Sequence, residues 1–204
     1  MSIEIKISKK PIDYIKAINF LEKRLENLKN GKSRELIWIL EHNDIYTAGL
    51  RSKNEEILDQ KIKVIRTNRG GKITWHGKGQ VIFYFVLDLS KRNKDIRKFI
   101  QTIENSIINT LKIFKINSHS DRKNVGIWVK EKKKIKKIAA IGIRVKKWIA
   151  YHGFSLNINN DLKKYNKIIP CGIKDKDVTN LKSLKNINYK NLKKILLENL
   201  IKNL

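Results

Sequence analysis

The order of its apolar segments limits the possible folds of this 204-residue chain more than any other feature. Apolar residues recur at helical spacing over 14–28 and over 96–114, and a shorter pattern of the same kind follows at 192–200. Continuous apolar runs at 35–40 and 80–89 have the length of buried strands. Because these helices and strands do not alternate as in a doubly wound sheet, we predict an α+β fold.

A hairpin is predicted around the charged run 130–137. Residues 126–129 precede this run and residues 138–145 follow it, and both segments are apolar enough for core strands. The chain shows no internal repeat, and its two prolines and ten glycines form no interdomain linker. We therefore expect residues 1–204 to form a single domain.

The charge of the chain is strongly positive. It has 46 Lys and Arg residues against 19 Asp and Glu residues, which gives a formal net charge of +27. Such a field attracts nucleic acids, anionic membranes and acidic proteins. However, Lys, Ile and Asn are abundant throughout the sequence, and we favour compositional drift over selection for a ligand as the source of the charge.

Cysteine usage and hydropathy indicate the compartment. No apolar run approaches the roughly eighteen residues of a membrane span, and the N-terminus lacks the apolar stretch of a signal peptide. The single cysteine, Cys171, permits neither an internal disulfide nor a zinc site built from several thiolates. We expect a cytoplasmic protein with no membrane partner, no metal and no other cofactor.

The segment 69–80 concentrates the features of a binding loop. It holds four of the ten glycines and lies just before a predicted strand. Glycine permits a positive φ and lets a ligand approach the backbone, while Arg69, Thr74 and His76 supply polar groups. This concentration favours a binding loop over a structural hairpin with a buried histidine. A Walker-type phosphate loop is excluded because the Gly-Lys-Ser/Thr ending is absent.

Two residues have the chemistry of a nucleophile and its partner. Cys171 lies between a proline and a glycine in the sequence, so we expect its thiol to be in a turn whose backbone is open to a substrate. Lys137 opens an apolar strand, where partial desolvation would lower the pKa of its ammonium and let it act as a base. Taken alone, a lone Cys is more often a small buried apolar residue, and one Lys among many is more often exposed. His76 and His152 are alternative bases.

Four groups of residues occur in one order along the chain: Arg-Gly-Gly…Thr…His-Gly…Gly-Gln at 69–80, Lys-Ile-Ala-Ala-Ile-Gly at 137–142, His-Gly-Phe with Leu-Asn at 152–157, and Pro-Cys-Gly-Ile with Val-Thr at 170–179. This set resembles the lipoyl(octanoyl) transferase family of lipoate biosynthesis, and the resemblance extends over residues 42–181. Three positions depart from the usual family pattern: Trp75 replaces Tyr, Lys78 replaces Pro and Asn180 replaces Ser.

The resemblance implies a fold like the catalytic domain of biotin and lipoate protein ligases, and a two-step acyl transfer. Cys171 would attack the thioester of octanoyl acyl carrier protein, and a lysine amine of a lipoyl domain would then attack the acyl-enzyme. Lys137 would lower the thiol pKa and later accept a proton from the amine. The acceptors would be lipoyl domains of 2-oxoacid dehydrogenase complexes or the glycine cleavage H protein.

The resemblance also implies a pocket for the acyl chain. Its residues come from the glycine-rich segment, the strand after Lys137 and the segment after His152: Arg69, Gly70, Gly71, Lys72, Ile73, Thr74, Trp75, His76, Ala140, Ile141, Gly142, Gly153, Phe154 and Ser155. The acidic carrier protein and lipoyl domain would be drawn to a basic surface.

Two other functions are alternatives. An ATP-dependent lipoate-protein ligase would have the same fold, but it would use its lysine on an acyl-adenylate and would not need Cys171. A nucleic-acid-binding protein is suggested by the charge of +27 and by four tryptophans as stacking surfaces. Because no recognised RNA or DNA motif is present, we expect no nucleic-acid partner.

Overall fold

The computed structural model describes residues 3–170 and 177–204. Its strands are β1 (Glu4–Ile7), β2 (Leu36–Leu40), β3 (Ile45–Ala48), β4 (Val64–Arg66), β5 (Ile73–His76), β6 (Gln80–Asp88), β7 (Ser118–Ser120), β8 (Ile127–Glu131), β9 (Lys134–Ile141), β10 (Arg144–Lys146) and β11 (Ile149–Asn157). Its helices are α1 (Tyr14–Lys29), α2 (Ile96–Ile113), α3 (Leu181–Leu184) and α4 (Leu192–Asn203), with short 3-10 turns η1 (Asn54–Glu56), η2 (Leu89–Lys91) and η3 (Leu162–Lys167).

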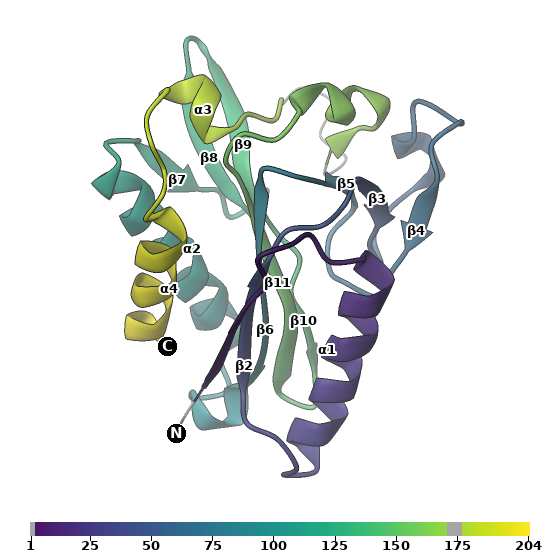
Figure 1. The fold of residues 1–204 in the computed structure, drawn as a ribbon, viewed down its shortest axis with the longest axis vertical. Coiled ribbons are helices and arrows are strands. Elements are labelled where there is room, and N and C mark those ends of the chain that lie inside the picture. The colour runs from purple at the N-terminus through teal and green to yellow at the C-terminus, as the bar shows by residue number, and fades with distance from the viewer. Residues whose placement is uncertain (1–2, 171–176) are drawn as a thin grey trace.

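A large mixed sheet forms the centre of the molecule, with strand order β1-β2-β6-β11-β9-β8-β7 and β10 added beside β11. Strands β6 and β11 pair antiparallel over their whole length, from Asp88 opposite Ile149 to Gln80 opposite Asn157. Nearly every residue of both strands is buried, because helices cover both faces of the sheet. Figure 1 shows α2 and α4 on one face and α1 on the other.

Local sequence signals define the helix that covers the second face. The carboxylate of Asp13 accepts a hydrogen bond from the backbone N–H of Lys16 at 2.9 Å and so caps the start of α1. Gly31, with φ 69, follows its end. The stripe that includes Leu21 and Leu25 packs on the side chains of β2 and β6 in one apolar cluster. Helices α2 and α4 cover the opposite face in a second, larger cluster.

A small three-stranded sheet, with order β4-β3-β5, lies beyond the N-terminal end of α1 (Figure 1). Strand β5 leads into β6 through the short turn at residues 77–79, so this small sheet is joined to the centre of the large one. A third apolar cluster, built around Ile73, Trp75, Tyr165 and Ile168, holds the small sheet against η3.

The structure confirms the predicted α+β class and most of the predicted elements. The helices expected at 14–28, 96–114 and 192–200 are α1, α2 and α4, and the strands expected at 35–40 and 80–89 are β2 and β6. Sequence reasoning did not identify β1, β3, β4, β5, β7, β10 or β11 as strands, although it marked residues of β5 and β11 as functional. Most of these are three or four residues long, too short for a periodic signal.

The predicted hairpin exists, but its boundaries were wrong. The lysine-rich run does not separate the strands, because most of it lies within β8 and β9, and only residues 132–133 connect them. The outer ends of both strands are solvated, which is why charged side chains are tolerated there. Strand β9 also ends at Ile141 rather than at residue 145, and the chain then forms β10 against β11.

The helices within residues 3–170 and 177–204 include none with the length and apolar character needed to cross a bilayer.

Gly153 leaves no room for a side chain between β11 and β6, because a Cβ there would overlap the carbonyl oxygen of Phe83. We expect Gly153→Ala to lower the free energy of unfolding by about 3 kcal/mol, measured by urea denaturation. The matched change Gly31→Ala has open space around its Cβ and meets only the cost of a positive φ, about 1 kcal/mol. Equal losses in the two variants would contradict this assignment.

Candidate active site

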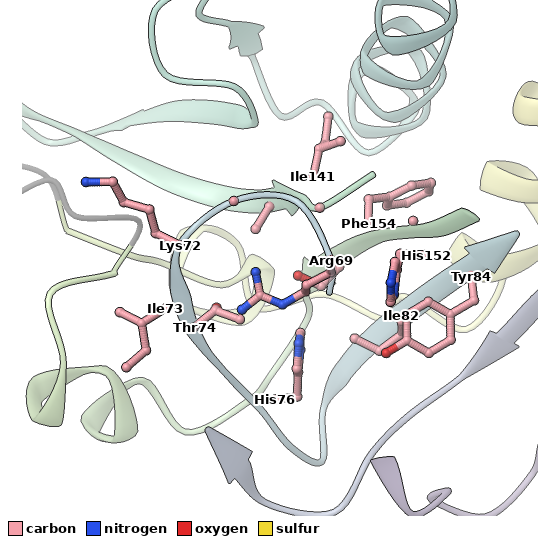
Figure 2. A pocket seen from close by; sticks show the side chains of 15 residues that line it. Arg69, Lys72, Ile73, Thr74, His76, Ile82, Tyr84, Ile141, His152 and Phe154 are labelled. Carbon is pink, nitrogen blue, oxygen red and sulfur yellow. The ribbon is translucent and has the colours of Figure 1, made fainter. Parts of the chain in front are cut away.

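A cavity lies between the glycine-rich segment and strands β9 and β11. It is lined by residues from four parts of the chain: Arg69, Gly71, Lys72, Ile73, Thr74, His76, Ile82, Tyr84, Ala140, Ile141, Gly142, His152, Gly153, Phe154 and Ser155. Figure 2 shows Lys72, Ile73 and Thr74 on one side of the cavity and Ile82, Tyr84 and His152 on the opposite side. The guanidinium of Arg69 lies between these two groups.

Strand pairing brings the distant segments together. On β9 and β11, Ala140 is opposite Ser155 and Ile141 is opposite Phe154. Just beyond β9, the N–H of Gly142 donates to the carbonyl of Gly153 at 2.8 Å, and the N–H of Gly70 donates to the carbonyl of Gly142 at 3.2 Å. The glycine-rich segment is therefore held across the ends of these strands by backbone hydrogen bonds.

The structure groups twelve of the fourteen residues expected in the acyl pocket around this cavity, and it places Gly70 and Trp75 elsewhere. On β5, alternation turns Thr74 and His76 to the cavity and Trp75 to the opposite face. There the indole packs edge-to-face against Tyr165, with ring centroids 5.7 Å apart. The backbone of Gly70 lies against Ile143, so this glycine serves the close approach of two chain segments.

Sequence reasoning left Ile82 and Tyr84 out of the pocket and considered His152 only as a base, yet all three line the cavity. Ile82 and Tyr84 belong to a fully buried strand, and nothing in an apolar run distinguishes a cavity-lining residue from a core residue.

Arg69 is a buried cation fixed by neutral acceptors. Its Nη2 donates to the carbonyl of Thr47 at 2.7 Å and to Thr47 Oγ1 at 2.9 Å, and its Nη1 donates to the carbonyl of Gly70 at 2.9 Å. These hydrogen bonds connect the start of the glycine-rich segment to strand β3. The positive charge faces the cavity (Figure 2) and disfavours protonation of the nearby histidines.

Three buried histidines are neutral at pH 7: His76 and His152, which line the cavity, and His42, whose ring centroid lies 5.8 Å from that of His76. Burial lowers the pKa of His42 to about 4 and, together with the charge of Arg69, lowers the pKa of His76 and of His152 to about 3. None of the three therefore has the pKa of an effective general base near pH 7. Their imidazoles instead act as hydrogen-bonding groups with fixed tautomers.

Hydrogen bonds determine these tautomers. The carbonyl of Ile12 only accepts, so His42 Nδ1 carries the hydrogen, and the Tyr84 hydroxyl donates to His42 Nε2 at 2.9 Å. Asn68 Nδ2 donates to Glu22 at 2.6 Å, which turns its Oδ1 toward His152 at 2.7 Å. His152 Nε2 therefore carries the hydrogen, and its Nδ1 is left as an acceptor.

A buried polar network extends from His76 through the core. His76 Nδ1 donates to Gln80 Oε1 at 2.6 Å, and Gln80 Nε2 donates to Asn157 Oδ1 at 2.8 Å. Asn157 Nδ2 then donates to the carbonyl of Thr179 at 3.0 Å. Because each amide is fixed by its next partner, the network ties the cavity to the chain segment that follows residue 176.

Lys137 is buried, with 6% of its surface exposed, in a chain whose lysines are mostly solvated. Its Nζ donates to the carbonyl of Val125 at 3.1 Å and lies 4.6 Å from the ring centroid of Trp128. Gly126, with φ 137, leaves room for this ammonium, since a Cβ there would lie 3.2 Å from Nζ. The prediction that Lys137 opens an apolar strand needs correction, because it lies inside β9 rather than at its start.

A β-bulge sets the direction of Lys137. Ile127 pairs with Ala139 and Trp128 pairs with Lys137, so Ile138 is an extra residue on β9. Ile138 and Ala139 both face the apolar cluster beneath α2 and α4. The bulge thus turns Lys137 to the same face as Ala140, which lines the cavity. Uninterrupted alternation would place these two side chains on opposite faces.

The predicted nucleophile, Cys171, lies outside the described residues, but the chain on either side of residues 171–176 is well anchored. Before it, the N–H of Ile169 donates to the carbonyl of Glu56 at 2.7 Å. After it, the N–H of Lys137 donates to the carbonyl of Asp177 and the N–H of Thr179 donates to the carbonyl of Lys137, both at 2.9 Å. The chain that follows residue 176 is therefore held on the backbone of Lys137.

In the part of the chain that the structure describes, His, Asp and Glu side chains form no group of three or more suited to a metal ion.

The neutral histidines predict how stability depends on pH. Below pH 6.5 the unfolded chain protonates these imidazoles while the folded protein resists until about pH 3 to 4, so the unfolded state binds more protons and stability falls as pH falls. Between pH 7 and pH 5 each histidine should account for a loss of about 2 kcal/mol. Urea denaturation at both pH values measures the loss.

The matched variants are His42→Gln and His119→Gln, because His42 is fully buried and His119 is exposed. His42→Gln should reduce the pH-dependent loss by about 2 kcal/mol, whereas His119→Gln should leave it unchanged. A pH-dependent loss of the same size in both variants would show that His42 is already protonated in the folded state at pH 5.

The chain matches known proteins over nearly its whole length. The family model of the lipoyl protein ligase A/B catalytic domain matches residues 13–201. An octanoyltransferase from Ehrlichia chaffeensis is 46% identical over 199 residues, which cover 96% of this chain and 93% of that relative.

Solved structures share the fold, as the sequence predicted. A crystal structure of lipoate-protein ligase A bound with ATP has a TM-score of 0.76 at 18% identity and covers 100% of this chain and 85% of that one. Biotin protein ligase from Aquifex aeolicus in complex with biotin and ATP has a TM-score of 0.56 at 17% identity, with coverage of 98% and 69%. The chain belongs to the lipoyl protein ligase A/B catalytic domain family.

Proposed function

We propose that this protein transfers an octanoyl group from octanoyl acyl carrier protein to a lysine of a lipoyl domain, through a thioester on Cys171. Residues 1–204 then act as one catalytic acyltransferase domain. The match to an octanoyltransferase over nearly the whole chain supports octanoyl transfer in lipoate biosynthesis. The acceptors would be lipoyl domains of 2-oxoacid dehydrogenase complexes or the glycine cleavage H protein.

One observation carries the proposal: a buried lysine is joined to the chain that carries the only thiol. Lys137 exchanges two backbone hydrogen bonds with Asp177 and Thr179, a few residues beyond Cys171. A buried ammonium without a carboxylate partner is costly, and here the described residues supply only a carbonyl and an aromatic ring. Such a cation is typical of a site that stabilises a thiolate.

In the proposed first half-reaction, the Cys171 thiol gives up its proton and its sulfur attacks the thioester carbonyl. The new carbon–sulfur bond forms as the bond to the carrier thiol breaks, and the carrier thiolate takes up the proton. Lys137 would favour the Cys171 thiolate and hand the proton to the leaving sulfur.

In the second half-reaction, the neutral amine of the acceptor lysine attacks the acyl-enzyme. The carbon–nitrogen bond forms, the bond to Cys171 breaks, and the extra proton on nitrogen passes through Lys137 to the departing sulfur. Atoms and charges balance in both steps without ATP.

The cavity supports this assignment because several of its lining side chains are apolar and its glycines let a ligand come close to the backbone. Ile73, Ile82, Ala140, Ile141 and Phe154 offer apolar surface to an acyl chain. At roughly 0.8 kcal/mol for each buried methylene, an eight-carbon chain gains on the order of 5 kcal/mol of binding free energy. A lipoate-protein ligase with the same fold would require ATP, so omission of ATP separates the two functions.

The first test is to incubate the purified protein with octanoyl acyl carrier protein, without ATP or acceptor, and to measure its intact mass. We expect one octanoyl adduct that is absent in Cys171→Ser and that discharges when a lipoyl domain is added. A folded wild-type protein that forms no adduct without ATP but modifies a lipoyl domain with ATP would favour the ligase.

The role of Lys137 is tested with a matched pair of neighbouring lysines. Lys137→Gln should slow acylation by at least about 100-fold, because the cation and the proton carrier are both lost. Lys136→Gln removes a lysine on the other face of β9, paired with Glu131 at 2.9 Å, and should leave the rate within about twofold. Similar rates for the two variants, measured by single-turnover acylation, would argue against a catalytic Lys137.

A further inference from the structure

His152 has three unusual properties in one place. It is 1% exposed, it lines the cavity, and its Nδ1 has no hydrogen-bond partner among the described residues. Its φ of 64 is in the left-handed region, although it lies within β11 and pairs with Phe85. A strained residue next to a cavity points to a function that compensates for the strain.

The unpaired Nδ1 is an acceptor and not a donor. Asn68 fixes the ring hydrogen on Nε2, as shown above, and burial keeps the ring neutral, with its pKa lowered to about 3. A buried lone pair without a donor is unfavourable, so this position favours a ligand that brings an O–H or N–H group.

The position of His152 along the sheet shows which part of a ligand it would meet. Ala139 is opposite Leu156, so Lys137 and His152 lie on opposite sides of this pair. With the bulge at Ile138 they are five register steps apart, roughly 17 Å along the strands at about 3.3 Å per residue. The Lys137 side chain covers part of this distance. An extended eight-carbon chain, roughly 9 Å long from carbon–carbon bonds of about 1.5 Å, covers the rest.

His152 lies beside Tyr84 and Ile82 at this end of the cavity (Figure 2). Its ring centroid lies 6.5 Å from that of Tyr84, and Figure 2 shows both residues beside Ile82, across the cavity from Lys72. The Tyr84 hydroxyl already donates to His42 and is not free to donate to His152. Because none of the described residues donates to His152 Nδ1, this position is open to a donor on a ligand that fills the cavity.

We propose that His152 is a specificity-determining residue whose Nδ1 accepts a hydrogen bond from a hydroxyl group at the far end of the acyl chain. The cavity would then transfer medium-chain acyl groups that end in a hydroxyl as well as plain octanoyl groups. This inference rests on the proposed function, because the acyl chain must enter with its carbonyl at the Lys137 end.

The test compares octanoyl and 7-hydroxyheptanoyl acyl carrier protein, whose acyl chains have the same number of heavy atoms but end in a methyl and a hydroxyl. An apolar cavity would penalise the hydroxyl by about 100-fold in kcat/KM. We expect a penalty below about 10-fold for the wild-type protein and about 100-fold for His152→Phe, which removes the acceptor and keeps a ring of similar size.

Two controls distinguish recognition of the terminal hydroxyl by His152 from a general change in the shape of the cavity. Ile82→Val removes a methyl group from the same end without touching an acceptor, so its penalty should equal that of the wild-type protein. The shorter pair hexanoyl and 5-hydroxypentanoyl needs no variant: its hydroxyl stops short of His152, so the wild-type penalty should return to about 100-fold.

The outcomes distinguish the two proposals. The role of His152 would be overturned if the penalty for the hydroxyl were the same in the wild-type protein and in His152→Phe. It would also be overturned if the wild-type protein showed the same penalty for both chain lengths. In either case octanoyl transfer would still stand. Absence of octanoyl transfer by the folded wild-type protein would overturn the proposed function and this inference with it.

Discussion

The antiparallel pairing of β6 with β11 is the contact on which the site depends. It extends over both strands and is buried on both faces, so neither strand can shift its register without exposing core side chains. This register brings Gln80 opposite Asn157, which lets their amides join His76 to the carbonyl of Thr179. Along its other edge β11 pairs with β9, the strand that carries Lys137.

Burial also determines the chemistry of the polar groups around the cavity. In a chain of net charge +27, the histidines near Arg69 stay neutral because desolvation and that guanidinium both oppose a second positive charge. They serve as hydrogen-bonding groups with fixed tautomers. In the proposed reaction we assign the proton transfers to Lys137, which is buried, unlike the solvated lysines nearby.

Irregular backbone gives the site its geometry. The bulge at Ile138 turns Lys137 to the cavity face, Gly126 leaves room for its ammonium, and His152 is held with a positive φ beside the cavity. Each of these departures costs stability by itself, and the fully paired sheet around them holds them in place.

The sequence by itself determined the α+β class, the three long helices, the two longest apolar runs and the family, because helical periodicity, run length and ordered motifs are local signals. It also marked most of the residues that line the cavity. Only the tertiary structure decided that Trp75 faces away, that Ile82, Tyr84 and His152 line the cavity, and that Lys137 shares a face with Ala140. These facts follow from strand register, a bulge and hydrogen bonds between residues far apart in sequence, none of which leaves a local pattern.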